Sequence, residues 1–247
     1  MKMNHLFMTG VILLSSGALT SLGSVVHADD TDNSVKTTGD VRFIEDTNPT
    51  DPIDPTDPTD PTDPVDPTDP ITPTEGPLSI DYASSFHFDE HKISAKDEIY
   101  TAAFDTVKGA NGVETRPNWI QVTDKRGTNA GWKLQVTQVN QFTTGEGDAA
   151  KELKGAELTL KNAASKSTPD NKAGQPTTPD KIDLVVGGSF DVMTAAKDQG
   201  MGTWLDVFGD GTTGDKSIEL MVPGASAKVK DGNYTTNLTW TLTDTPA

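Results

Sequence analysis

Residues 87–91 are His-Phe-Asp-Glu-His and formally match the His-x-x-Glu-His pattern of a class of zinc peptidases. In such a site the two histidines bind zinc from one face of a helix, and the glutamate reaches the metal-bound water. The apolar residues Ile80, Tyr82, Phe86 and Phe88, which lead into the motif, instead indicate an extended run. On a strand the two histidines would lie about 13 Å apart. We therefore expect a solvated turn here, with no metal and no cofactor.

Other catalytic patterns find little support. The sequence has no Gly-x-Ser-x-Gly motif, and the signal peptide described below takes away every histidine outside 87–91, so a serine hydrolase would lack its base. Carboxylates are numerous, but none stands in the aromatic-rich setting expected of a glycosidase pair. The acidic residues between 206 and 215 lack the alternating spacing of an EF-hand loop, and we expect a tight turn there. The sequence thus predicts a protein that is not an enzyme.

Two segments about a hundred residues apart share a Trp-x-Leu motif. On a β-strand the Trp and the Leu point to the same face, because side chains alternate with a period of two. The second segment, 234–243, alternates apolar and polar residues along its whole length, which is typical of a half-buried strand. The motif residues, as binding or fold-defining candidates, are Trp132, Leu134, Tyr234, Leu238, Thr239, Trp240, Leu242 and Pro246.

This pair of motifs, with Tyr-x3-Leu-Thr-Trp-x-Leu-x3-Pro closing the printed sequence, resembles the WxL domain of cell-surface proteins from Gram-positive bacteria. The resemblance covers about residues 76–247. It implies non-covalent attachment to the cell wall through peptidoglycan, and it implies assembly with other wall proteins. It does not tell whether the Trp-x-Leu side chains contact the ligand or form the core. From the residues alone we expect Trp132 and Trp240 mainly to pack in the core.

The N-terminus indicates export. A lysine, an apolar run and the small-x-small site Val26-His27-Ala28 predict a signal peptide over residues 1–28. No later run is long enough to span a bilayer, which needs about 20 residues, so we expect no integral membrane segment after cleavage. The formal net charge is −17. Because nucleic-acid affinity comes mainly from basic side chains, a nucleic-acid partner is disfavoured.

After a short polar segment, 29–45, the chain becomes a repeat of Asp-Pro-Thr. Seven Asp-Pro pairs follow one another with a period of three between 51 and 70. Proline fixes φ and restrains the preceding residue, so this tract favours polyproline II. We expect residues 46–76 to form a disordered or polyproline II, stiff and solvated acidic spacer, and deleting 51–70 to leave the domain unaffected.

Residues 77–247 predict an all-β domain. Short period-two segments separated by Gly-, Asn- and Asp-rich turns favour an antiparallel β-sandwich-like fold without cysteine cross-links. Residues 163–180 predict a long polar loop. The expected strands are 78–88, 99–104, 119–123, 132–139, 156–161, 182–186, 190–194, 203–208, 217–222 and 234–243.

These features together predict a secreted protein that is associated with the cell wall on the bacterial surface, where it is a component of a surface complex. Its partners would be peptidoglycan and other surface proteins. The alternative is an adhesin that binds a host or matrix ligand. Binding to sacculi stripped of protein would separate the two.

Overall fold

The structure is a computed structural model, and it describes residues 35–59, 64–109 and 112–244. The predicted signal peptide, 1–28, and the motif residue Pro246 lie outside the described residues. The chain divides into two units after Val41. Residues 35–41 are extended and exposed, and the β domain belongs to the second unit.

The regular structure of the described residues is β-strand, with two short 3-10 turns at 147–149 and 214–216 and no α-helix. All the strand pairs of the sheets are antiparallel, which confirms the all-β prediction. The strands are β1 (Asp66–Pro67), β2 (Leu78–Ala83), β3 (Glu98–Thr101), β4 (Asp105–Gly109), β5 (Gly112–Arg116), β6 (Trp119–Asp124), β7 (Trp132–Gln138), β8 (Thr143–Thr144), β9 (Lys151–Glu152), β10 (Glu157–Lys161), β11 (Ala163–Lys166), β12 (Lys181–Leu184), β13 (Ser189–Ala195), β14 (Gly202–Phe208), β15 (Ile218–Val222) and β16 (Leu238–Thr243).

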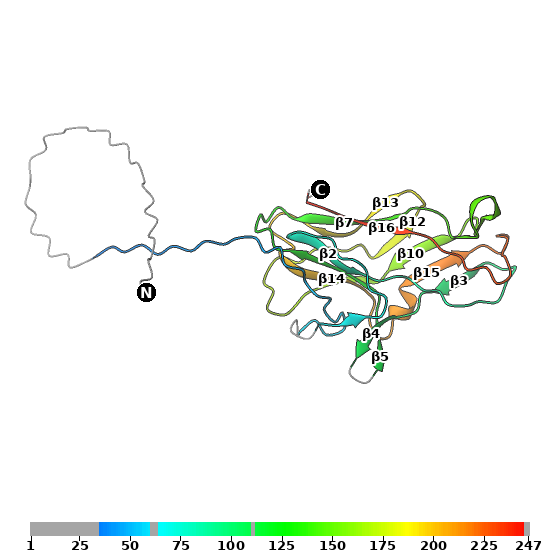
Figure 1. Cartoon of the computed structure of the whole chain (residues 1–247), viewed down its shortest axis with the longest axis horizontal. Coiled ribbons are helices and arrows are strands. Elements are labelled where there is room, and N and C mark those ends of the chain that lie inside the picture. Colours follow the sequence, from blue (N-terminus) through cyan, green and yellow to red (C-terminus); the bar gives the residue numbers. More distant parts are fainter. Residues whose placement is uncertain (1–34, 60–63, 110–111, 245–247) are drawn as a thin grey trace, which may run out of the picture. The chain divides into compact units, whose positions relative to one another are not determined.

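Three sheets enclose one core (Figure 1). The sheet β11-β14-β6-β2 forms one layer, and the sheets β12-β10-β15-β3 and β13-β7-β16 supply the residues that face it. Alternate side chains of each strand enter this core, as the period of two requires. Strand β7, for example, is buried at every second residue and half-buried between them. The predicted β-sandwich-like architecture is confirmed.

Each of the ten predicted strand ranges overlaps an observed strand. The first ends five residues earlier than predicted, at Ala83. The N–H of Ser84 still donates to the carbonyl of Trp119, but the N–H of Trp119 donates to the hydroxyl of Ser84 in place of its carbonyl, which interrupts the ladder. The hairpin β4–β5 was not predicted. Strand β11 also corrects the prediction that 163–180 is entirely loop, since 163–166 pair with β14.

The outer face of the sheet β11-β14-β6-β2 is covered by the Asp-Pro tract, which we call the strap (residues 51–71, described except for 60–63). Ile53 is 4% exposed, and it packs with Trp119 and Leu205 in a second core cluster. Its N–H donates to Oε1 of Gln121 at 2.7 Å. The Arg116 guanidinium binds the Asp54 carboxylate at 2.8 Å and, against the desolvation of partial burial, lowers the pKa of that carboxyl.

This packing corrects the expectation of a wholly solvated spacer. The repeat departs from Asp-Pro-Thr where Ile53 and Val65 replace threonine, and both residues join the second core cluster. Further along, β1 pairs with β4, and Pro67 is buried. Ile71, at the end of the strap, packs against the same cluster. These three apolar residues anchor the strap, and Ile53 contributes most, because fully burying an aliphatic side chain stabilises by about 1.5–3 kcal/mol.

Candidate functional site

The first Trp-x-Leu motif lies inside the sandwich. Strand β7 is the central strand of its sheet, with β13 on one side and β16 on the other. Trp132 and Leu134 are completely buried. The indole N–H of Trp132 donates to the carbonyl of Gly200 at 2.9 Å, and Gly200 has φ +77° and approaches the ring too closely for a side chain. This motif therefore has no surface with which to bind a ligand.

The second Trp-x-Leu motif lies at the edge of the same sheet. Its register places Trp240 opposite Val136 and Leu242 opposite Leu134. On β16 the side chains of Leu238, Trp240 and Leu242 are only half-buried, although they pack against the main core. The expectation that Trp240 is mainly a core residue therefore describes only part of its environment.

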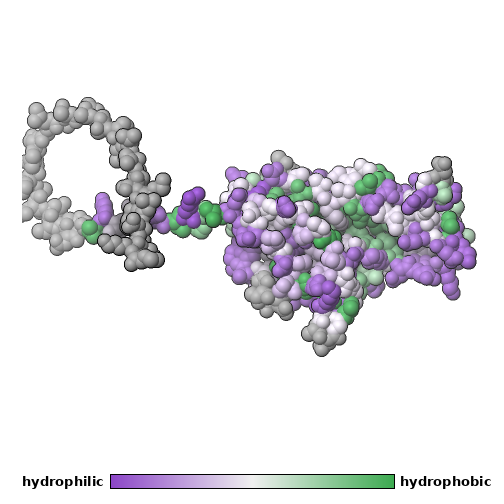
Figure 2. Space-filling view, viewed as in Figure 1, coloured by the Kyte–Doolittle hydropathy of each residue, from purple (hydrophilic) through white to green (hydrophobic). Residues whose placement is uncertain are grey.

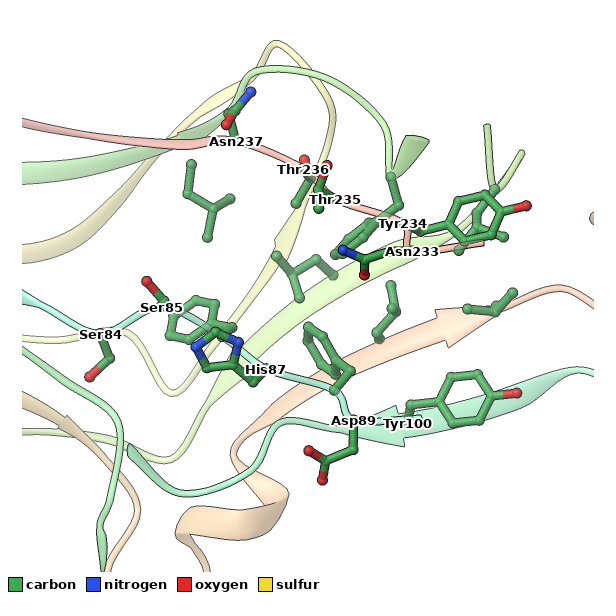
Figure 3. Close-up of a pocket in the computed structure, with 18 of the residues that line it drawn as sticks. Ser84, Ser85, His87, Asp89, Tyr100, Asn233, Tyr234, Thr235, Thr236 and Asn237 are labelled. Atoms are coloured by element: carbon green, nitrogen blue, oxygen red, sulfur yellow. The ribbon is translucent and has the colours of Figure 1, made fainter. Parts of the chain in front are cut away.

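A cleft of about 1200 Å³ opens beside this edge strand. Residues 233–240, which include the motif residues Tyr234, Leu238, Thr239 and Trp240, form one wall. The opposite wall is residues 83–89 with 91–93, and Figure 3 shows Ser85, His87 and Asp89 across from Thr235 and Asn237. The structure thus places four of the eight predicted site residues on one cleft. Trp132 and Leu134 lie outside it.

The floor of the cleft is apolar. Leu158 of β10, together with Leu220 and Val222 of β15, lines its base. Figure 2 shows an apolar hollow on this face of the domain, surrounded by more polar surface. An apolar base with a polar rim is the usual composition of a ligand site, because burial supplies affinity and the few polar groups supply orientation.

The aromatic rings of the cleft pack against one another. Phe86 lies edge to face with Trp240, with ring centroids 6.4 Å apart. Phe88 meets Phe142 in the same way at 6.1 Å, and the ring of His91 stacks on Tyr100 at 4.0 Å. These contacts hold the wall formed by 84–93 against the sheets.

The rim carries a mixed charge. His87 Nε2 lies 3.4 Å from a carboxylate oxygen of Asp69, so the end of the strap reaches the cleft. The other charged residues of the lining are Asp89, Lys92 and Lys228. Desolvation, aided by Glu98, raises the pKa of Tyr100.

The predicted turn at 87–91 is irregular backbone in the structure, with Asp89 at φ 57°. His91 bonds the carbonyl of Phe88 through its ring, and the two histidines are engaged by different partners. In the described part of the chain, no three His, Cys, Asp or Glu side chains gather as a metal site.

A family model described as WxL domain, surface cell wall-binding, matches residues 30–246. The chain belongs to the WxL domain family. The matched range begins ahead of the strap and includes both Trp-x-Leu strands of the WxL domain. No curated protein and no solved structure matched the chain. Within the described residues of this WxL protein, no helix has the length and apolar character needed to cross a membrane.

Sequence reasoning missed the wall formed by 83–93 and the contribution of Ile71, Thr72 and Thr74 to the cleft. The available signal was Phe86 and Phe88, two large apolar residues that follow the end of a strand. They were interpreted as a continuation of that strand.

Proposed function

We propose that this protein is exported to the bacterial surface and held non-covalently at the cell wall, where its WxL domain binds peptidoglycan through the cleft beside β16. The observation that carries the proposal is the position of the second Trp-x-Leu motif. In a chain of a wall-binding family, this motif borders a large cleft with an apolar floor, while the first motif is buried.

The geometry supports binding rather than catalysis. The rim of the cleft consists mostly of Ser, Thr and Asn side chains, which donate and accept hydrogen bonds but do not act as strong acids or bases. The histidines at its edge are exposed and engaged by different groups. We infer that the cleft binds its ligand unchanged.

We further propose that the protein works as a component of a surface complex. Just ahead of the strap, Phe43 is 87% exposed and Ile44 is 80% exposed in an extended segment. Neighbouring large apolar side chains exposed on a soluble chain favour a contact with a partner. This segment supports assembly with another wall protein.

The test is co-sedimentation of residues 29–247 with purified sacculi stripped of protein. Ser85→Trp places a large ring inside the cleft, and Ser189→Trp makes the same change at the exposed start of β13, outside it. We expect the parent and Ser189→Trp to sediment and Ser85→Trp to stay in the supernatant with an unchanged melting temperature. A parent protein that stays in the supernatant would refute wall binding, and a loss of sacculus turbidity would refute binding without catalysis.

A further inference from the structure

Strand β16 has a strand partner on one side only. Strand β7 pairs with it, and within the described residues no strand pairs with its other edge. The carbonyl of Asn237 accepts from the N–H of Val139 at 2.8 Å. This bond shows that Asn237, and every second residue after it, directs its backbone groups toward β7. In an antiparallel pair the residues alternate, so Thr239 and Thr241 direct their backbone groups toward β7. Leu238, Trp240 and Leu242 direct theirs away from it.

This free edge borders the cleft. Residues up to Trp240 form one of the cleft walls, so the outward N–H and C=O groups of Leu238 and Trp240 face open space. Unpaired edge groups of a strand are a template for another extended chain. Peptide recognition by strand addition uses such an edge for affinity and the neighbouring pockets for alternate side chains.

The cleft floor matches the side chains of such an added strand. Leu238 and Trp240 are half-buried and present an apolar strip beside the free edge. Phe86 and Phe88 of the opposite wall are half-buried as well. The side chains on one face of an extended chain added to β16 would enter this apolar space.

The same cleft offers few stacking surfaces to a sugar ring. Sugars stack their apolar faces on aromatic platforms. Here Phe86 packs on Trp240, and the face of Tyr100 is occupied by the ring of His91. Phe88 packs on Phe142 as well, so of the Phe, Tyr and Trp rings in the described lining Tyr234 alone has no ring partner. The cleft therefore offers mainly apolar edges and a backbone ladder, with one ring as a stacking platform.

The lining of the cleft is less acidic than the chain as a whole. The chain has a formal net charge of −17, but the cleft lining contains two lysines, Lys92 and Lys228, and one carboxylate, Asp89. The short peptides that cross-link wall glycan strands carry small alkyl side chains and carboxylates. The ammonium of Lys228 donates to the carbonyls of Pro223 and Ser226, so the charge argument rests mainly on Lys92. A carboxylate of an extended wall peptide can pair with Lys92 at the rim.

We propose that the ligand of the cleft is the peptide part of peptidoglycan, bound in extended form as an added strand on β16. The inference rests on the proposed wall attachment and adds the chemical class of the bound group. The glycan strand stays outside the cleft.

The test uses residues 29–247 labelled with ¹⁵N, and amide hydrogen exchange measured residue by residue. The probes are the free peptides and the peptide-free glycan strands obtained when an amidase digests purified sacculi. We expect the peptides to slow exchange at Leu238 and Trp240 at least tenfold. Thr239 and Thr241 are already bonded to β7 and should change little. The glycan strands should leave all four amides unchanged.

Two lysine variants test the charge argument. Lys92→Glu changes the rim of the cleft, and Lys197→Glu makes the same change at an exposed site outside it. Reversing one exposed charge should weaken peptide binding about three- to tenfold for Lys92→Glu. Lys197→Glu should bind like the parent.

Each other outcome overturns a different claim. Sacculi that retain the protein while the peptides leave the β16 amides unchanged would refute the peptide and keep wall attachment. Protection by the glycan strands would assign the cleft to sugar. Equal protection by an unrelated L-peptide of the same length would indicate a protein partner at this edge and refute the wall peptide. A protein that sacculi do not retain would refute the proposed function itself.

Discussion

The two Trp-x-Leu strands, β7 and β16, share a motif and a sheet but have different surroundings. Trp132 is completely buried, and its indole N–H is bonded to a carbonyl. Trp240 faces the same core from the edge of the sheet, remains half-buried and borders the cleft. The motif places both indoles on the inner face of the sheet. The position of the strand within the sheet then decides which indole a ligand can reach.

The largest expected effect is that of Trp132→Ala. Removing a buried tryptophan costs about 3–5 kcal/mol of unfolding free energy, a large share of the roughly 5–15 kcal/mol that stabilises a domain. Urea denaturation followed by circular dichroism measures the loss. A variant as stable as the parent would remove the contrast between the two motifs, since Trp132 would then not be a core residue.

Trp240→Ala should separate core packing from ligand binding, because Trp240 contacts the core and also borders the cleft. Because the side chain is half-buried, we expect a smaller loss of about 2–3 kcal/mol. Retention on sacculi should fall at least tenfold at a temperature where circular dichroism shows the variant to be folded. If a folded variant is retained like the parent, Trp240 does not contribute to the binding surface.

A substitution in the strap should change the stability of the domain without changing its binding to the wall. Ile53→Thr restores the Asp-Pro-Thr repeat and removes a buried apolar contact, which should cost about 1–2 kcal/mol. Since Ile53 lies on the outer face of a different sheet from Trp240, wall retention should not change. An unchanged melting temperature would show that the strap does not contribute to stability.

The buried Asp206 of β14 should make the stability of the domain depend on pH. Its side chain is fully buried with no hydrogen-bond partner among the described residues, and burial raises its pKa. Below the unfolded pKa of about 3.9 the carboxyl is neutral in both the folded and the unfolded protein, and its burial does not lower the free energy of unfolding through a charge. As pH rises through the higher folded pKa, the folded protein must bury a charged carboxylate, and that stability is lost. Asp206→Asn should therefore match the parent near pH 3.5 and become increasingly more stable toward pH 8. Urea denaturation across this range measures the difference, and parallel profiles would contradict it.

The sequence predicted the parts of the fold that depend on local pattern. Period-two segments such as Ile218–Val222 appear as strands because one face meets the core. Strand order and edge position could not be predicted, since they depend on pairings between distant segments. For the same reason the alternation of 234–243 showed a half-buried strand but not that its second edge is free.

The strap shows a different limit of sequence reasoning. The Asp-Pro-Thr composition indicates a solvated chain, and composition outweighed two isolated apolar residues, Ile53 and Val65. Their effect depends on an outer sheet face that contains Trp119, Gln121 and Leu205, and nothing in the tract itself reveals that face. A departure from an otherwise regular repeat was the available signal.

The most direct test of the central claim is ¹⁹F NMR of the chain labelled with 5-fluorotryptophan, with the Trp240 signal assigned through Trp240→Phe and the Trp132 signal through Trp132→Phe. Soluble peptidoglycan fragments are added stepwise. If β16 borders the ligand site, the Trp240 signal shifts in a saturable manner and the Trp132 signal does not move. A saturable shift at Trp132 with none at Trp240 would contradict the account.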